Sequence, residues 1–182
     1  MVSLPKPYPF RFAVGALLIL VVLAGLIFAL DPKSELARAA REKEAALGNE
    51  GVRARADLKE IGELAARAQR QAKATVIRIT GSGCSDCACR TGDLRRIDAA
   101  SPCMTAWLTV LRRLDAAAGS TGAEAKYGRD PWGSPYAIDE NQGEGSAAAC
   151  RAADRLRSVG KDGVYGTDDD MIVSVLLADT CP

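Results

Sequence analysis

The sequence predicts an α+β fold, in which a long N-terminal helix leads to a second, shorter helix and a small antiparallel sheet. Three observations predict it. An uninterrupted apolar stretch near the N-terminus continues into a segment rich in alanine, glutamate and arginine. A second amphipathic stretch follows residue 101. Short strand-like segments, separated by loops of glycine and aspartate, occupy the C-terminal part.

The first element, residues 1–30, is expected to be a short cytoplasmic start and a transmembrane helix. Phe12 to Leu30 contains no charged residue, and at 1.5 Å per residue a helix of that length nearly crosses a hydrocarbon core of about 30 Å. Lys6 and Arg11 precede it, so the N-terminus should stay in the cytoplasm and the rest should lie outside. The alternative is a cleaved secretory signal, which also places the remainder outside.

The second element, residues 31–80, is expected to be an amphipathic stem helix. Asp31 and Pro32 fit an N-cap and a first helical position. Glycines 48 and 51 disfavour helix, so a break is expected between them. A sparse apolar face recurs at helical spacing through Leu58, Ile61, Leu64 and Ala68.

The third element, residues 81–182, is expected to be the extracytoplasmic globular domain. Ser101 and Pro102 predict the start of a core-facing helix. Its apolar positions are Met104, Trp107, Leu108, Leu111 and Leu114. Trp107 on this face is interpreted as packed core. The strand candidates are 136–138, 156–159 and 171–177.

Charge and composition argue against several classes of function. Lysine plus arginine (24) nearly balances aspartate plus glutamate (23), so bulk charge does not favour nucleic acid. The chain has no histidine, which removes the commonest general base and the usual activator of a nucleophile. We therefore expect a protein that is not an enzyme.

Six cysteines in an exported domain are most simply explained by disulfides. They are Cys84, Cys87, Cys89, Cys103, Cys150 and Cys181. The first three are too close together to pair only among themselves, so at least one should bond to a later cysteine. The alternative is a metal cluster on these three, for which the spacing is a weak zinc signal.

An acidic, glycine-rich loop lies between the last two strand candidates, from Ser158 to Asp170. Four carboxylates on so short a loop repel one another, and a calcium ion would offset that repulsion with carboxylate and carbonyl oxygens as ligands. Glycines 160, 163 and 166 would let the backbone curl inward. The spacing is not that of an EF-hand, and a solvated hairpin with Asx turns is the alternative.

Three segments together resemble the C-terminal half of type IV pilin-like proteins, most closely the G-type major pseudopilins of type II secretion. These segments are Asp130–Tyr136 (DPWGSPY), the acidic loop 139–145, and 158–170 (SVGKDGVYGTDDD). The resemblance implies a pilin-like fold and a calcium ion in the last loop. It implies side-chain ligands from Asp162, Asp169 and Asp170, and carbonyl ligands from Val159 and Thr167.

The N-terminus departs from the pattern of that family. Met1 to Leu30 contains no acidic residue, and no glycine precedes Gly15, whereas family precursors carry a glycine before the cleavage site and a glutamate soon after it. This favours a minor or unprocessed subunit.

The resemblance implies a structural subunit of a type IV pilus-like or type II secretion-like filament. Its partners would be other pilin or pseudopilin subunits, through the N-terminal helix, together with the membrane and the assembly machinery at the inner face. The alternative is a membrane-anchored adhesin or binding domain that does not assemble and uses the cysteine-rich segment 84–103.

Overall fold

The structure, a computed structural model, describes residues 32–145 and 150–175. The chain divides between Leu47 and Gly48 into two compact units. All buried core residues among those described belong to the second unit. The predicted division at residues 30 and 80 followed composition, whereas the second unit joins residues 48–72 to the segments that follow them.

Helix α2 runs from Pro32 to Ala72 and is interrupted at Gly48. It begins at the predicted residue, while Asp31 lies outside the described residues. Gly48 has φ 66° and ψ −176°, a conformation that is not helical and that residues with a side chain rarely adopt. The predicted break is therefore confirmed.

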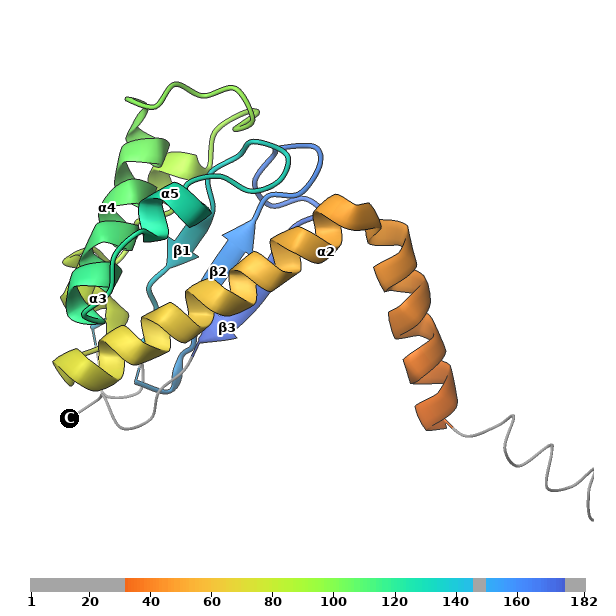
Figure 1. Cartoon of the computed structure of the whole chain (residues 1–182), viewed down its shortest axis with the longest axis horizontal. Coiled ribbons are helices and arrows are strands. Elements are labelled where there is room, and N and C mark those ends of the chain that lie inside the picture. Colours follow the sequence, from red (N-terminus) through yellow and green to blue (C-terminus); the bar gives the residue numbers. More distant parts are fainter. Residues whose placement is uncertain (1–31, 146–149, 176–182) are drawn as a thin grey trace, which may run out of the picture. The chain divides into compact units, whose positions relative to one another are not determined.

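The part of α2 after Gly48 crosses one face of the sheet (Figure 1). The predicted apolar face is buried there: Leu58, Ile61, Leu64 and Ala68 are at most 3% exposed. Gly62 brings the helix close to the strands, since a Cβ atom at this position would lie 3.4 Å from Val175 and 3.7 Å from Leu156. Packing against the sheet therefore supplies the stability that a solvated helix of this composition lacks.

The sheet has three antiparallel strands in the order β1-β2-β3. They are β1 (Ala137–Asp139), β2 (Asp154–Ser158) and β3 (Met171–Val175). Ile138 pairs with Leu156, which pairs in turn with Val173. Alternate residues of β2 are buried, as expected for a sheet covered on one face. The predicted α+β class and the three predicted strands are confirmed to within a few residues.

Helix α4 (Pro102–Ala117) is the predicted core-facing helix, and Ser101 caps it by accepting a hydrogen bond from the backbone N–H of Met104. Its predicted apolar positions are buried except Leu108, which is half-buried. Trp107 is 1% exposed and donates its indole N–H to the carbonyl of Tyr127 at 2.8 Å. The interpretation of Trp107 as core is confirmed.

Three short helices were not predicted as separate elements, although the first of them falls within the predicted stem helix, residues 31–80. They are α3 (Val76–Thr80), the 3₁₀ turn η1 (Cys87–Cys89) and α5 (Ala123–Tyr127). Each is at most five residues long, which is too short for a helical apolar period to appear in the sequence. The segment 81–89, expected as a loop, thus contains one helical turn.

Within residues 32–145 and 150–175, none of the helices is long and apolar enough to cross a membrane. The predicted transmembrane span, Phe12 to Leu30, lies outside these residues.

Candidate metal loop and its surroundings

The loop between β2 and β3 is folded tightly around its glycines. Gly160, Gly163 and Gly166 all have positive φ, between 70° and 88°. A Cβ atom at Gly160 would lie 2.5 Å from a carboxylate oxygen of Asp169 and 2.6 Å from its carbonyl oxygen. Only glycine allows this approach, so the backbone curls as predicted.

Asp162 and Asp169, two of the predicted calcium ligands, meet across this loop. Asp169 accepts a hydrogen bond from the backbone N–H of Asp162 at 3.0 Å and from the hydroxyl of Thr167 at 2.7 Å. Asp162 accepts from the N–H of Val164, which is an Asx turn. Burial alone would raise the pKa of Asp169, but these hydrogen bonds outweigh it and hold the pKa below its ordinary value. Asp169 is therefore a carboxylate at neutral pH.

Asp170, the third predicted side-chain ligand, points to a different partner. Its Oδ2 accepts from the guanidinium of Arg157 on β2 and from the N–H of Gly166 at 2.8 Å. Its Oδ1 is buried and has no hydrogen-bond partner among the residues that the structure describes. An unpartnered buried carboxylate oxygen is costly, and a cation would satisfy it.

The two predicted carbonyl ligands have different surroundings. Val159 is fully buried in a small core cluster with Cys89, Leu94 and Ala137. The carbonyl of Thr167 accepts a hydrogen bond from the N–H of Asp170 at 3.3 Å, which leaves one lone pair for another partner.

An all-oxygen donor set that includes the ionised carboxylate of Asp169 suits a hard cation such as calcium. The loop carboxylates alone do not enclose an ion. In the part of the chain that the structure describes, only one group of three acidic or cysteine residues has its ligand atoms within 4.8 Å of one another, and it lies outside this loop. That group is Cys84, Asp86 and Cys87. A calcium ion held by Asp162, Asp169 and Asp170 would therefore need backbone carbonyls and water as well.

The cysteines form disulfides. Cys84 bonds to Cys87, Cys89 bonds to Cys103, and Cys150 is also disulfide-bonded. Cys181 lies outside the described residues. Since Cys84 and Cys87 share a bond, they offer no thiolates for zinc. The prediction of disulfides, and of a bond from the 84–89 cluster to a later cysteine, is confirmed.

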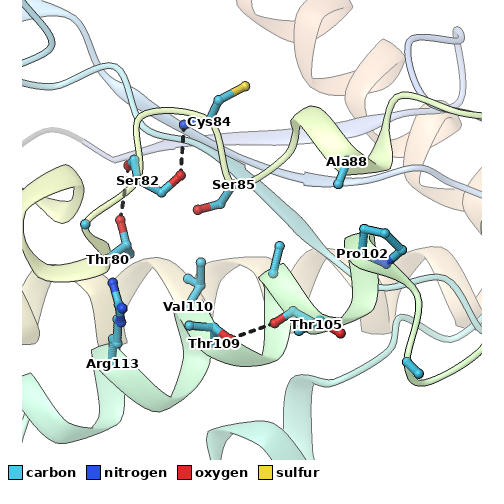
Figure 2. A pocket seen from close by; sticks show the side chains of 13 residues that line it. Thr80, Ser82, Cys84, Ser85, Ala88, Pro102, Thr105, Thr109, Val110 and Arg113 are labelled. Carbon is cyan, nitrogen blue, oxygen red and sulfur yellow. Dashed lines mark hydrogen bonds between the residues drawn. The ribbon is translucent and has the colours of Figure 1, made fainter.

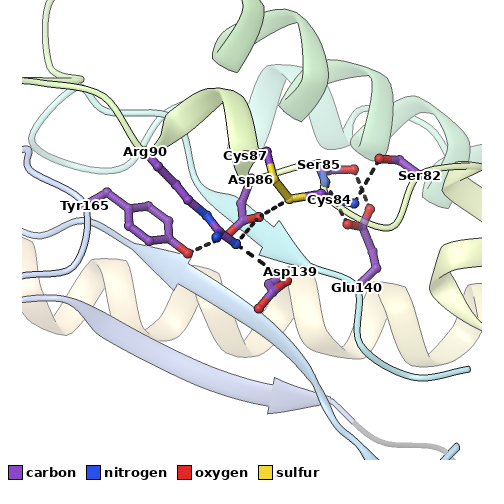
Figure 3. The surroundings of a disulfide bond; sticks show 9 residues. All are labelled: Ser82, Cys84, Ser85, Asp86, Cys87, Arg90, Asp139, Glu140 and Tyr165. Carbon is purple, nitrogen blue, oxygen red and sulfur yellow. Dashed lines mark hydrogen bonds and ion pairs between the residues drawn. A yellow bond between two sulfur atoms is a disulfide. The ribbon is translucent and has the colours of Figure 1, made fainter. Parts of the chain in front are cut away.

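Tyr165 connects the acidic loop to the first disulfide (Figure 3). Its hydroxyl donates to the carboxylate of Asp86, which is 1% exposed and lies between Cys84 and Cys87 in the sequence. Arg90 also bonds to Asp86, at 3.0 and 3.1 Å. The guanidinium of Arg157 lies 4.3 Å from the centre of the Tyr165 ring, a cation–π contact. Burial and the Asp86 hydrogen bond raise the pKa of Tyr165, so it remains a donor.

The DPWGSPY motif forms a turn that Asp130 organises from inside. Asp130 is 5% exposed, and its carboxylate accepts from the N–H groups of Trp132 and Ser134 and from the hydroxyl of Ser158 on β2. Burial raises its pKa, while these hydrogen bonds oppose the rise. The motif is thus tied to the sheet immediately before the acidic loop.

A buried polar cluster lies at the other end of β1, and sequence reasoning missed it. Glu140, Gln142 and Asp154 are fully buried. Glu140 accepts from Thr80 and Ser85, and Asp154 accepts from the N–H groups of Asn141 and Gln142. The sequence offered one signal for this cluster, the position of segment 139–145 directly after a strand candidate. That signal is weak, because an acidic loop is ordinarily solvated.

Comparison with protein-family models, with curated proteins and with solved structures found no match to the chain.

Proposed function

We propose that this chain is a membrane-anchored, pilin-like structural subunit of a type IV pilus-like or type II secretion-like filament, whose last loop is stabilised by calcium. The apolar segment 12–30 would pack in the filament core or remain in the membrane. The unit from Gly48 onward would form the outer surface. The missing glycine and glutamate near the N-terminus favour a minor or unprocessed subunit.

The observation that carries the proposal is the loop between β2 and β3. A helix packed on a three-stranded antiparallel sheet is a common arrangement, but this sheet ends in a glycine-curled loop with an ionised Asp169 and an unpartnered, buried oxygen of Asp170. Both features favour a bound cation over a solvated hairpin. The exposed Asp162 would supply the third carboxylate. Calcium would contribute positive charge, which lowers the repulsion among the three carboxylates.

The first test is the thermal unfolding of the full chain in detergent, with millimolar calcium, magnesium or a chelator. Calcium at 100 times its dissociation constant should add about 2.7 kcal/mol of stability. Asp162→Ala and Asp169→Ala should each remove this gain. Asp168→Ala, an exposed neighbour on the same loop, is the matched control and should keep it. No change in the unfolding temperature with calcium would indicate that the loop is a solvated turn without a bound ion.

The second test concerns assembly and is independent of calcium. Cysteine crosslinking between introduced pairs in segment 12–30, in cells, should give ladders of this chain with itself or with other pilin-like subunits. A protein recovered only as an uncrosslinked monomer would favour the alternative, an anchored binding domain.

A further inference from the structure

A pocket of about 580 Å³ opens between α4 and the segment from Thr80 to Ala88 (Figure 2). It lies beside the cysteine-rich segment 84–103, and the Cys89–Cys103 disulfide holds its two walls together, because it links η1 to the first turn of α4. The acidic loop between β2 and β3 contributes no residue to it. The pocket is therefore separate from the candidate calcium site.

The lining of the pocket is rich in hydroxyl groups and carries one charge. Most of its other side chains are small, and no aromatic ring or carboxylate is found among the described residues that line it. The polar lining residues are Thr80, Ser82, Ser85, Thr105, Thr109 and Arg113. Such a surface favours a ligand with several hydroxyl groups and a negative charge.

Arg113 is the charged group, and its guanidinium is free to bind. Within the described part of the chain it forms no hydrogen bond and no ion pair. Its neighbour Arg112 is different, since it bonds to Glu124 at 2.9 Å and to Thr109 at 3.0 Å. An unpaired guanidinium at a pocket is the donor geometry that carboxylates and phosphates match.

Gly81 leaves the space in which the guanidinium lies. It ends α3 with φ 64°, and a Cβ atom there would be 2.8 Å from a terminal nitrogen of Arg113. A side chain at position 81 would displace the guanidinium from this place. The C-cap of α3 thus fixes one end of the pocket.

The buried carboxylate of Glu140 accepts hydrogen bonds from two residues of the pocket wall. Thr80 donates its hydroxyl to Glu140, and Ser85 donates both its N–H and its hydroxyl. The hydroxyl oxygen of Ser85 can still accept a hydrogen bond, and Ser82, which accepts from the N–H of Cys84 at 3.2 Å, still has a proton to donate. The wall therefore keeps donors and acceptors for a ligand.

We propose that this pocket binds an acidic saccharide, with the carboxylate of the sugar on Arg113 and its ring hydroxyls on Ser82, Ser85 and Thr105. A simple oxyanion would occupy only the guanidinium and leave most of a 580 Å³ hollow unused. This binding role goes beyond the filament role and does not depend on it.

The test is titration calorimetry on the full chain in detergent, with digalacturonate as the probe. Maltose is the neutral control and inorganic phosphate is the control for a bare oxyanion. Saturable binding of digalacturonate is expected. Arg113→Gln should weaken it about tenfold or more, the usual effect of losing a charge-assisted hydrogen bond. Arg78→Gln, at an exposed position on α3 that is not among the lining residues, should leave it unchanged. Thr105→Val, at an exposed position, should weaken it several-fold.

Four results would overturn the proposal. The first two are the absence of saturable binding by the native chain and an equal loss of affinity in the Arg78 and Arg113 variants. The other two are binding of maltose, or of phosphate, as tight as that of digalacturonate. The last would indicate an oxyanion site only. None of these results bears on calcium, whose readout is the thermal midpoint.

Discussion

Asp154, buried at the start of β2, should make the stability of the fold depend on pH. Burial raises its pKa to about 6, assisted by the nearby carboxylates of Glu140 and Asp139 and opposed by hydrogen bonds from the N–H groups of Asn141 and Gln142. The folded state therefore binds this proton more tightly than the unfolded state does. Its contribution to stability is complete below about pH 4 and is lost as the pH rises through 6.

We therefore expect the native chain to lose up to about 3 kcal/mol between pH 4 and pH 7 relative to Asp154→Asn, which cannot titrate. Urea unfolding of both proteins across this range measures the difference. Asp130, whose pKa is also raised by burial, is present in both proteins and cancels in the comparison. Equal pH profiles would show that Asp154 is not the group responsible.

Residue-scale prediction from the sequence worked where a residue's role follows from its neighbours in the chain. Ser101 as a cap, Trp107 as core and the curl at Gly160 are local consequences of sequence. Glu140 and Asp154 could not be assigned in this way, because their burial depends on Thr80, Ser85 and a turn that are distant in the sequence. The partner of Asp170, Arg157, likewise became apparent only once β2 and β3 were paired.

At the scale of elements, the two described disulfides should differ in their effect on stability. Cys89–Cys103 closes a loop with a sequence separation of 14, whereas Cys84–Cys87 has a separation of 3. On the loop-entropy account, each bond restricts the unfolded chain and so stabilises the folded state, by about 3 kcal/mol for the first bond and about 2 kcal/mol for the second. The first also joins η1 to α4.

We expect the paired change Cys89→Ala and Cys103→Ala to lower the free energy of unfolding by at least about 1 kcal/mol more than Cys84→Ala and Cys87→Ala does. Denaturant unfolding of the two double variants gives the comparison. A larger loss from the Cys84 and Cys87 pair would show that contacts of the 84–87 turn, such as that of Asp86, outweigh loop closure.

Helix α2 and the sheet meet at Gly62, and the space there is limited. Gly62→Ala should raise stability by up to about 1 kcal/mol, since alanine favours helix and its Cβ would make ordinary contacts with Val175 and Leu156. Gly62→Leu should destabilise by about 1–3 kcal/mol through overpacking. Thermal unfolding of both variants is the measurement. A decrease in stability of more than about 1 kcal/mol in the alanine variant would mean that α2 and the sheet cannot shift to make room for the added Cβ atom.

Element prediction succeeded for the strands and for the long helices because their periods persist over several residues. It did not separate α3 from the stem helix and did not predict η1 or α5, which are set by contacts with α4 and by a disulfide. Tertiary context, not local propensity, determines such short helices.

For the whole molecule, Gly48 marks the boundary of a unit that should withstand proteolysis. Its backbone leaves the helical conformation, and residues 48–50 are exposed. A glutamate-specific protease should therefore cut first after Glu50 and leave a resistant fragment beginning at Gly51. Gly48→Ala should slow this cleavage several-fold. The backbone of alanine is strained at φ 66°, so the substitution favours a continuous helix. Mass spectrometry of timed digests measures both rates. Equal rates would contradict the role of Gly48.

Among the described residues, the sequence predicted the order of the main helices and the strands but not the extent of the compact unit. Composition changes abruptly near residue 80, so the sequence predicts a boundary there. Packing instead depends on residues such as Leu58 and Gly62, which belong to the stem by composition and to the globular unit by contact. The anchor, the filament and the calcium ion remain predictions that the experiments above address.

The contact between Tyr165 and Asp86 has a consequence for the oxidative folding of the protein. Asp86 lies between Cys84 and Cys87, so whatever holds Asp86 in place also favours the approach of the two thiols. By thermodynamic reciprocity, oxidation of those thiols must favour the contact between Tyr165 and Asp86, and with it the folded loop between β2 and β3, by the same free energy. Oxidation of the thiols and folding of the loop between β2 and β3 thus favour each other. An enzyme that introduces this one disulfide would at the same time favour the folding of a loop some eighty residues further along the chain.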